Sequence, residues 1–155
     1  MIDRLPVPLA RLVYRVGYVV LRLASLVLRP RTRGVKCLVF HGDDLLLVRH
    51  TYGPRHWDIP GGFCRRGESF DAAAHRELAE ELGIEGARWT SLGDLDRRHQ
   101  RRREMVGALR ADVAGREVTL QPAEIEAARW FPRAALPDDR AEIVDLVLEM
   151  DTPPR

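Results

Sequence analysis

The chain changes its hydrophobic period along its length, and each change marks a different kind of element. Residues 8–29 are apolar over most of a helical circumference and carry one stripe of arginines, which predicts an amphipathic helix. A second helix is predicted between Ser69 and Gly83, because serine suits the position before a helix and glycine the position after it. A third helix begins near Leu136–Asp139. Strands are predicted at residues 35–40, 45–49, 87–94, 104–112 and 117–120.

These elements divide the chain into a short N-terminal segment and one domain. Residues 1–30 hold the N-terminal helix, which ends at Pro30 because the proline ring cannot continue it. Residues 31–34 are a predicted linker, residues 35–150 the domain and residues 151–155 a tail. The chain has 155 residues, of which 45% are hydrophobic and 31% charged, as in one globular domain with a core of its own.

The N-terminal helix is strongly basic. Residues 1–34 hold seven arginines and one acid, so the rest of the chain is slightly acidic. Arginines at positions 11, 15 and 22 interrupt the apolar run, so a spanning helix is not expected, and a cleaved signal peptide is not expected because no small-residue cleavage site follows. Three interpretations of residues 8–29 remain open. The helix binds an anionic membrane surface, or it packs its wide apolar face on the domain or on a second subunit. In the third interpretation the start codon is misassigned and the segment has little consequence.

The cysteines and histidines favour neither zinc nor a serine–histidine triad. Cys37 and Cys64 show no metal-ligand spacing and no disulfide framework, which is typical of reduced thiols in the cytoplasm. The five histidines are scattered, without a paired spacing or a nearby serine nucleophile. The candidate chemistry therefore lies with the carboxylates.

Acidic side chains crowd one face of the second predicted helix. Glu77, Glu80 and Glu81 are three or four residues apart, so they project from the same side of a helix. Their mutual repulsion is relieved by a hard divalent cation, and ligands that are all oxygen suit magnesium or manganese. The sequence therefore predicts a Mg²⁺ site, with Mn²⁺ as the alternative.

The stretch 62–84 has the order G-x5-E-x7-R-E-L-x-E-E-x-G-I and resembles the Nudix box. The fixed positions of that motif are filled by Gly62, Glu68, Arg76, Glu77, Leu78, Glu80, Glu81, Gly83 and Ile84. The preceding residues 57–62 resemble the W-x-x-P-G-G segment common in the same family. The resemblance implies an α+β fold, an α/β/α sandwich with a mixed β-sheet between helices, which follows the N-terminal amphipathic helix. It covers Val35 to about Met150.

The resemblance also implies a reaction and a set of roles. The reaction is hydrolysis of a nucleoside diphosphate linked to another moiety, for which carboxylate-held cations neutralise the phosphates and activate water. Glu77 and Glu81 are expected as metal ligands, with Glu80 as a ligand or a water-mediated partner. Glu124 precedes a segment that resembles a later Nudix strand and is expected as one more metal-binding acid, with Glu126 as the alternative. The general base is expected to be Glu77, Glu80 or a loop acid such as Glu124.

Four residues of the box are expected to be structural. Glu68 and Arg76 are expected to hold the box loop against the helix through a salt bridge or hydrogen bonds. Gly62 and Gly83 are expected to serve the backbone conformation.

Candidate substrate contacts lie outside the box: Arg49, His50, Trp57, Arg101 and Arg103. Trp57 either stacks on a base or packs in the core. The arginine-rich segment 97–103 is either a phosphate clamp or a solvated hairpin tip, and it lacks the interleaved aromatic residues of a nucleic-acid surface.

The sequence leaves the substrate open between a nucleoside triphosphate and a nucleotide-sugar-like diphosphate, with capped RNA kept as a further alternative. Two other functions are weighed against the soluble hydrolase. One is a catalytically silent nucleotide-binding module that regulates a partner, and the other is a membrane-attached hydrolase of a lipid-linked diphosphate. The expected location is cytoplasmic, peripheral at the membrane if residues 8–29 bind lipid. A homodimer is favoured slightly over a monomer because of the apolar helix.

Overall fold

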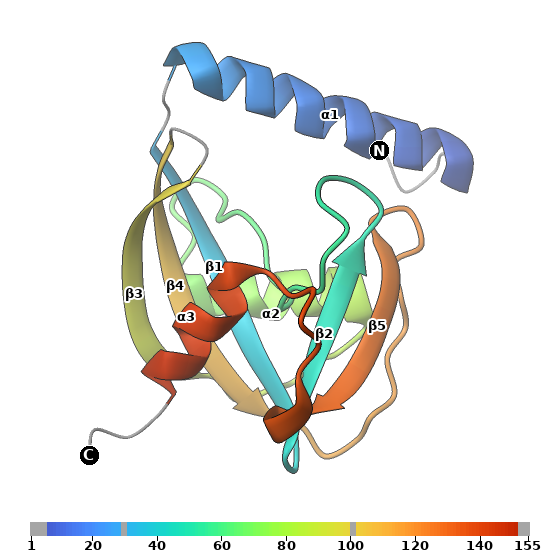
Figure 1. The fold of residues 1–155 in the computed structure, drawn as a ribbon, viewed down its shortest axis with the longest axis vertical. Helices are drawn as coiled ribbons and strands as arrows, with labels where there is room; N and C mark the ends of the chain where they lie inside the picture. Colours follow the sequence, from blue (N-terminus) through green and yellow to red (C-terminus); the bar gives the residue numbers. More distant parts are fainter. Residues whose placement is uncertain (1–5, 29–30, 100–101, 152–155) are drawn as a thin grey trace.

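The computed structural model describes residues 6–28, 31–99 and 102–151. It consists of a five-stranded mixed sheet with a helix on each face and a further helix, α1, lying across one end (Figure 1). The strands follow the spatial order β3-β4-β1-β2-β5, with β1 parallel to β4 and the other neighbours antiparallel. The helices are α1 (Val7–Leu28), α2 (Phe70–Leu82), α3 (Glu142–Met150) and the short 3-10 helix η2 (Arg133–Ala135). The strands are β1 (Arg31–His41), β2 (Asp44–His50), β3 (Thr90–His99), β4 (Arg102–Asp112) and β5 (Ile125–Pro132).

The two central strands are apolar on both faces because each face is covered by a helix. In β1, Val35, Cys37 and Val39 face the core beneath α2, whereas Leu38 and Phe40 face the core beneath α3. Side chains of β2 alternate between the same two cores. Alternate residues of a strand point to opposite faces, so near-continuous apolar runs are expected in strands covered on both sides. The fold is the α/β/α sandwich with a mixed sheet that the sequence predicts.

The observed elements differ from the sequence prediction at several positions, and α3 begins at Glu142 rather than near residues 136–139. Residues 31–34, predicted as a linker, are the first part of β1 and pair with β4. Strand β3 begins at Thr90 rather than at residue 87. Residues 117–120, predicted as a strand, are described but form none.

Residues 117–120 instead run past the C-terminal end of α2. The N–H of Thr119 donates to the carbonyl of Leu82 at 2.8 Å, and the N–H of Gln121 donates to that of Glu81 at 3.0 Å. The last carbonyls of a helix lack partners within it, so these bonds satisfy both the helix end and the passing chain. An apolar alternation in this segment therefore serves packing against α2 rather than pairing in a sheet.

The helix α1 contacts the domain through its polar and aromatic side. The Arg11 Nε donates to the Pro122 carbonyl at 3.0 Å, and the Arg15 Nε donates to the Thr51 carbonyl at 3.3 Å. The Tyr14 ring stacks on the Tyr52 ring with centroids 5.8 Å apart. The interpretation in which the wide apolar face packs on the domain is therefore wrong, because the arginine and tyrosine side occupies that contact. Within the described ranges, no helix has the length and apolarity needed to cross a bilayer.

Candidate active site

The helix α2 is fixed at both ends as the sequence predicts. The Ser69 Oγ accepts the N–H of Ala72 at 3.1 Å, and Gly83 adopts the left-handed conformation with φ 66°. Both caps satisfy backbone groups that a helix end leaves unpaired. They set the register of the helix, and so determine which of its glutamates turn toward the sheet.

An ion pair holds the loop before α2 against the helix. The Arg76 Nε and Nη2 donate to the two carboxylate oxygens of Glu68 at 2.9 and 2.8 Å. The Arg76 Nη2 also donates to the Phe63 carbonyl at 3.0 Å, and its Nη1 to the Glu77 Oε1 at 2.7 Å. Hydrogen bonds from Arg76 and from the Arg65 N–H lower the pKa of Glu68 to about 2. The bridge expected between Glu68 and Arg76 is thus present.

The two glycines before the loop allow the backbone to approach both β1 and a glutamate. Gly61 has φ 145°, and a Cβ there would lie 2.1 Å from the Val35 carbonyl oxygen. A Cβ on Gly62 would lie 2.4 Å from the Glu77 carboxylate. The Gly62 carbonyl accepts the Val35 N–H at 2.9 Å, so the segment pairs with β1. Only glycine leaves room for both the strand contact and the carboxylate.

The acids of α2 occupy different environments. Glu81 is 1% exposed and accepts a long hydrogen bond of 3.4 Å from the Gly61 N–H. Burial, followed by the charges of Glu124 and Glu77, raises the pKa of Glu81 well above its ordinary value. Burial also raises the pKa of Glu77, against the opposing effect of Arg76. Glu80 is exposed and contacts Arg65 and Arg76 at 3.2 and 3.4 Å.

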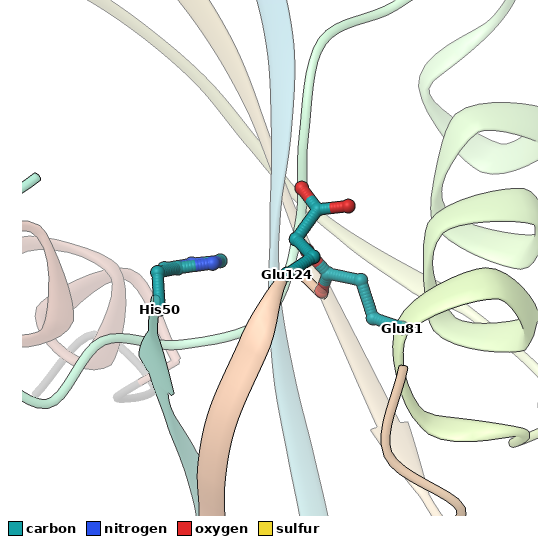
Figure 2. A group of neighbouring side chains, drawn as sticks. All are labelled: His50, Glu81 and Glu124. Atoms are coloured by element: carbon teal, nitrogen blue, oxygen red, sulfur yellow. The ribbon is translucent and has the colours of Figure 1, made fainter. Parts of the chain in front are cut away.

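Glu81, Glu124 and His50 bring their ligand atoms together from three elements. One ligand atom of each lies within 4.8 Å of the others, and Figure 2 shows the His50 ring pointing from the end of β2 toward the two glutamates. The His50 Nδ1 is buried and has no hydrogen-bond partner among the described residues. Burial lowers the pKa of His50 to about 4, so its imidazole is neutral near pH 7. The two crowded carboxylates are ligands that suit Mg²⁺ or Mn²⁺, whereas the neutral imidazole of His50 is a ligand more typical of transition metals.

Glu124 is held in place by the loop after β2. The Tyr52 Oη donates to the Glu124 Oε1 at 2.9 Å, and the Thr51 N–H donates to the Glu124 carbonyl at 2.8 Å. The Glu124 N–H donates to the Gln121 Oε1 at 2.7 Å. The alternative acid, Glu126, pairs with Arg55 at 2.6 Å and is exposed. Of the two, the geometry therefore places Glu124 in the cluster.

Sequence reasoning missed Tyr52. A single tyrosine carries no periodicity or spacing that marks it as a partner of a residue 72 positions away. Such a pairing depends on which two loops the sheet brings together.

Glu77, Glu80 and Glu124 line a cavity of about 610 Å³. Its polar lining includes Lys36, His50, Tyr52, Glu77, Glu80, Arg97, Glu104 and Glu124. The Lys36 Nζ donates to the Asp58 Oδ2 at 2.7 Å, and the Arg97 Nε lies 3.4 Å from the Glu104 carboxylate. A cavity of this size accommodates a small-molecule ligand, and its mixed charge suits an anion accompanied by cations.

The other predicted substrate contacts lie elsewhere. Trp57 is 7% exposed and packs edge-to-face on Phe131 in the core beneath α3, so the packing alternative holds. Arg49 lies over the Trp57 ring and pairs with Asp139 at 2.8 Å, and neither Arg49 nor Trp57 is among the described residues that line the cavity.

Among the described residues of the arginine-rich segment 97–103, Arg97 lines the cavity. Arg103 pairs with Asp96 at 3.4 Å and is exposed, whereas Arg101 lies outside the described residues. Of the described arginines of this segment, Arg97 therefore lies at the cavity and Arg103 does not.

The fold and the carboxylate cluster together define a Nudix-type domain. The sequence profile of the NUDIX domain matches residues 30–149, and the chain belongs to that family. The MutT NUDIX hydrolase of Burkholderia pseudomallei superposes with a TM-score of 0.72 at 26% identity, over 79% of this chain and 99% of that one.

Two curated relatives share part of the sequence. The NAD-capped RNA hydrolase NudC of Stutzerimonas stutzeri (strain A1501) is 35% identical over 109 residues, which cover 64% of this chain and 36% of the relative. The ADP-ribose pyrophosphatase of Mycobacterium tuberculosis (strain ATCC 25618 / H37Rv) is 47% identical over 49 residues, 31% of this chain and 24% of the relative. The matches thus span only about a quarter to a third of the length of these relatives.

Proposed function

We propose that this protein is a divalent-metal-dependent pyrophosphohydrolase that cleaves the diphosphate bond of a nucleoside diphosphate linked to another group. The observation that carries the proposal is the buried Glu81 beside Glu77 and Glu124, of which the latter two line the cavity. Three carboxylates in this position destabilise the protein unless a cation joins them. The similarity to a NAD-capped RNA hydrolase and to an ADP-ribose pyrophosphatase supports the substrate class, since both named substrates contain a nucleoside diphosphate.

The less exposed carboxylates are the proposed metal ligands. Glu77, Glu81 and Glu124 would hold the cation, with Tyr52 fixing Glu124 through its hydroxyl. A bound divalent cation would neutralise the phosphate oxygens and lower the pKa of the attacking water.

Three further groups complete the proposed roles. Glu80 lines the cavity and is 54% exposed, and in this proposal it would accept the proton of the attacking water. Lys36 and Arg97 add positive charge to the cavity lining and would orient the diphosphate. A cytoplasmic location stays a prediction.

A substrate panel tests this function. Phosphate-bond cleavage is measured with magnesium on ADP-ribose, NADH, NAD-capped RNA, nucleoside triphosphates and dinucleoside polyphosphates. We expect cleavage of at least one nucleoside diphosphate derivative, its loss in EDTA, and its loss in Glu81→Gln. Tight binding of a nucleotide without turnover would instead support the silent regulatory module. Full activity of Glu81→Gln would contradict the metal assignment.

A further inference from the structure

The helix α1 has two faces, and the inner face is fixed to the loops of the active site. Arg11 and Arg15 donate to the Pro122 and Thr51 carbonyls, and Tyr14 stacks on the ring of Tyr52. Tyr18 lies 5.9 Å from the same ring, between centroids, and also lines the cavity. The orientation of α1 on the domain is thus set by specific contacts on one side.

The outer face is apolar and exposed. Its residues recur every three or four positions, the spacing that places side chains on one face of a helix. Their exposed fractions run from 37% to 58%, large values for aliphatic side chains. They are Leu9, Leu12, Val13, Val16, Val19, Val20 and Leu23. A contiguous apolar face of this length on an otherwise charged protein indicates a binding surface.

The charge of the helix identifies what binds there. Residues 7–28 contain three arginines and no acid, and residues 1–34 contain seven arginines and one acid. Arg11 and Arg15 are exposed even though each donates one hydrogen bond to a domain carbonyl, so their guanidinium groups remain accessible from outside the protein. Accessible arginines on a helix with an apolar face fit a surface that presents phosphate groups above hydrocarbon.

A second copy of the chain fits this surface poorly. Two such helices would bring arginines together without an acid in either helix to pair with them. The charge of the helix therefore favours lipid over a copy of the chain.

We propose that the outer face of α1 binds the surface of an anionic lipid bilayer, with the helix axis parallel to the membrane. The aliphatic side chains enter the boundary between headgroups and acyl chains, and the arginines contact lipid phosphates. The domain stays on the water side, because the inner face of α1 holds it there. This proposal concerns where the protein acts and does not depend on the proposed reaction.

Vesicle co-sedimentation of the full chain tests the proposal. Vesicles of phosphatidylcholine with phosphatidylglycerol are compared with vesicles of phosphatidylcholine alone, at low and high salt. The test variant carries Leu12→Gln, Val16→Gln and Val20→Gln, and the matched control carries methionine at the same three positions. Thermal unfolding without vesicles checks that both variants remain folded.

We expect the wild type and the methionine variant to bind the anionic vesicles, more weakly at high salt, and the glutamine variant to bind at least tenfold more weakly. Failure of the wild type to bind, equal binding to pure phosphatidylcholine, or unchanged binding of the glutamine variant would overturn the proposal. Analytical ultracentrifugation without lipid gives an independent check. A wild-type dimer that the glutamine substitutions convert to a monomer would show that the face joins two copies, and would also overturn it.

Discussion

Replacing Glu81 by glutamine should stabilise the metal-free protein while removing its activity. Glu81 is 1% exposed, and its ligand atom lies within 4.8 Å of that of Glu124. Two charges at that separation repel by on the order of 3 kcal/mol at an effective dielectric constant of about 20. The wild type avoids part of this penalty by protonation, because the pKa of Glu81 is raised. We therefore expect the substitution to add about 1–3 kcal/mol to the free energy of unfolding in EDTA. Each kcal/mol should raise the melting temperature by about 2–4 °C.

Magnesium should cancel most or all of this difference in stability. A cation at 100 times its dissociation constant adds about 2.7 kcal/mol to a protein that binds it only when folded. The wild type should gain this stability and Glu81→Gln should not. Turnover by Glu81→Gln should fall by more than the roughly 100-fold loss that is typical of residues that only support a metal ligand. Thermal unfolding in EDTA and in magnesium, with steady-state kinetics, measures both effects.

Glu126→Gln is the matched control for this experiment. It removes an exposed carboxylate that pairs with Arg55, two positions from Glu124, and should respond to magnesium as the wild type does. The reasoning is refuted if Glu81→Gln is less stable than the wild type in EDTA, or if magnesium stabilises both equally.

The pH dependence of the same pair gives a further check. Because the pKa of Glu81 is raised above its ordinary value of 4.5, the native state binds this proton more tightly than the unfolded chain does. The wild type therefore gains stability from this group as the pH falls through the folded-state pKa toward 4.5. The difference in unfolding free energy between Glu81→Gln and the wild type in EDTA should therefore shrink over that range. A difference that grows on acidification would contradict the burial argument.

Three other substitutions separate positioning, shape and packing. Gly62→Ala places a methyl group 2.4 Å from the Glu77 carboxylate, so it should lower turnover at least about 100-fold with little change in the unfolding midpoint, and an active variant would show that Glu77 is not needed where it lies. Tyr52→Phe removes the 2.9 Å hydrogen bond to Glu124 and should cost about 10–100-fold in magnesium affinity, read from the metal dependence of turnover. Trp57→Phe should lower stability in urea by less than the about 3–5 kcal/mol of a truncation to alanine and leave KM unchanged, whereas a large rise in KM would favour base stacking.

Local chemistry made much of the site predictable. The caps at Ser69 and Gly83 involve neighbours in sequence, and the bond from Arg76 to Glu68 spans eight positions. Helical spacing likewise predicted that Glu77 and Glu81 share a side of α2. The site could be read this far because the interacting residues are close along the chain.

Tertiary packing overrode local pattern at other positions. Residues 117–120 alternate like a strand, but the Thr119 N–H binds the Leu82 carbonyl at the end of α2, which lacks a partner within the helix. Trp57 had the chemistry to stack on a base, yet it lies in the core beneath α3. Both outcomes depend on which elements meet, and a segment by itself does not contain that information.

By itself, the sequence determined the box helix with its acids and caps, the two-sided apolar strands of the sandwich, and the presence of a basic amphipathic helix in front of them. Only the tertiary structure decided that Tyr52 and His50 join Glu124 and Glu81, and that α1 turns its arginines and tyrosines inward and its aliphatic residues outward. Periodicity records which residues share a face, because that follows from backbone geometry. Which face is buried depends on hydrogen-bond acceptors, here the Thr51 and Pro122 carbonyls, that the folded domain presents from distant parts of the chain.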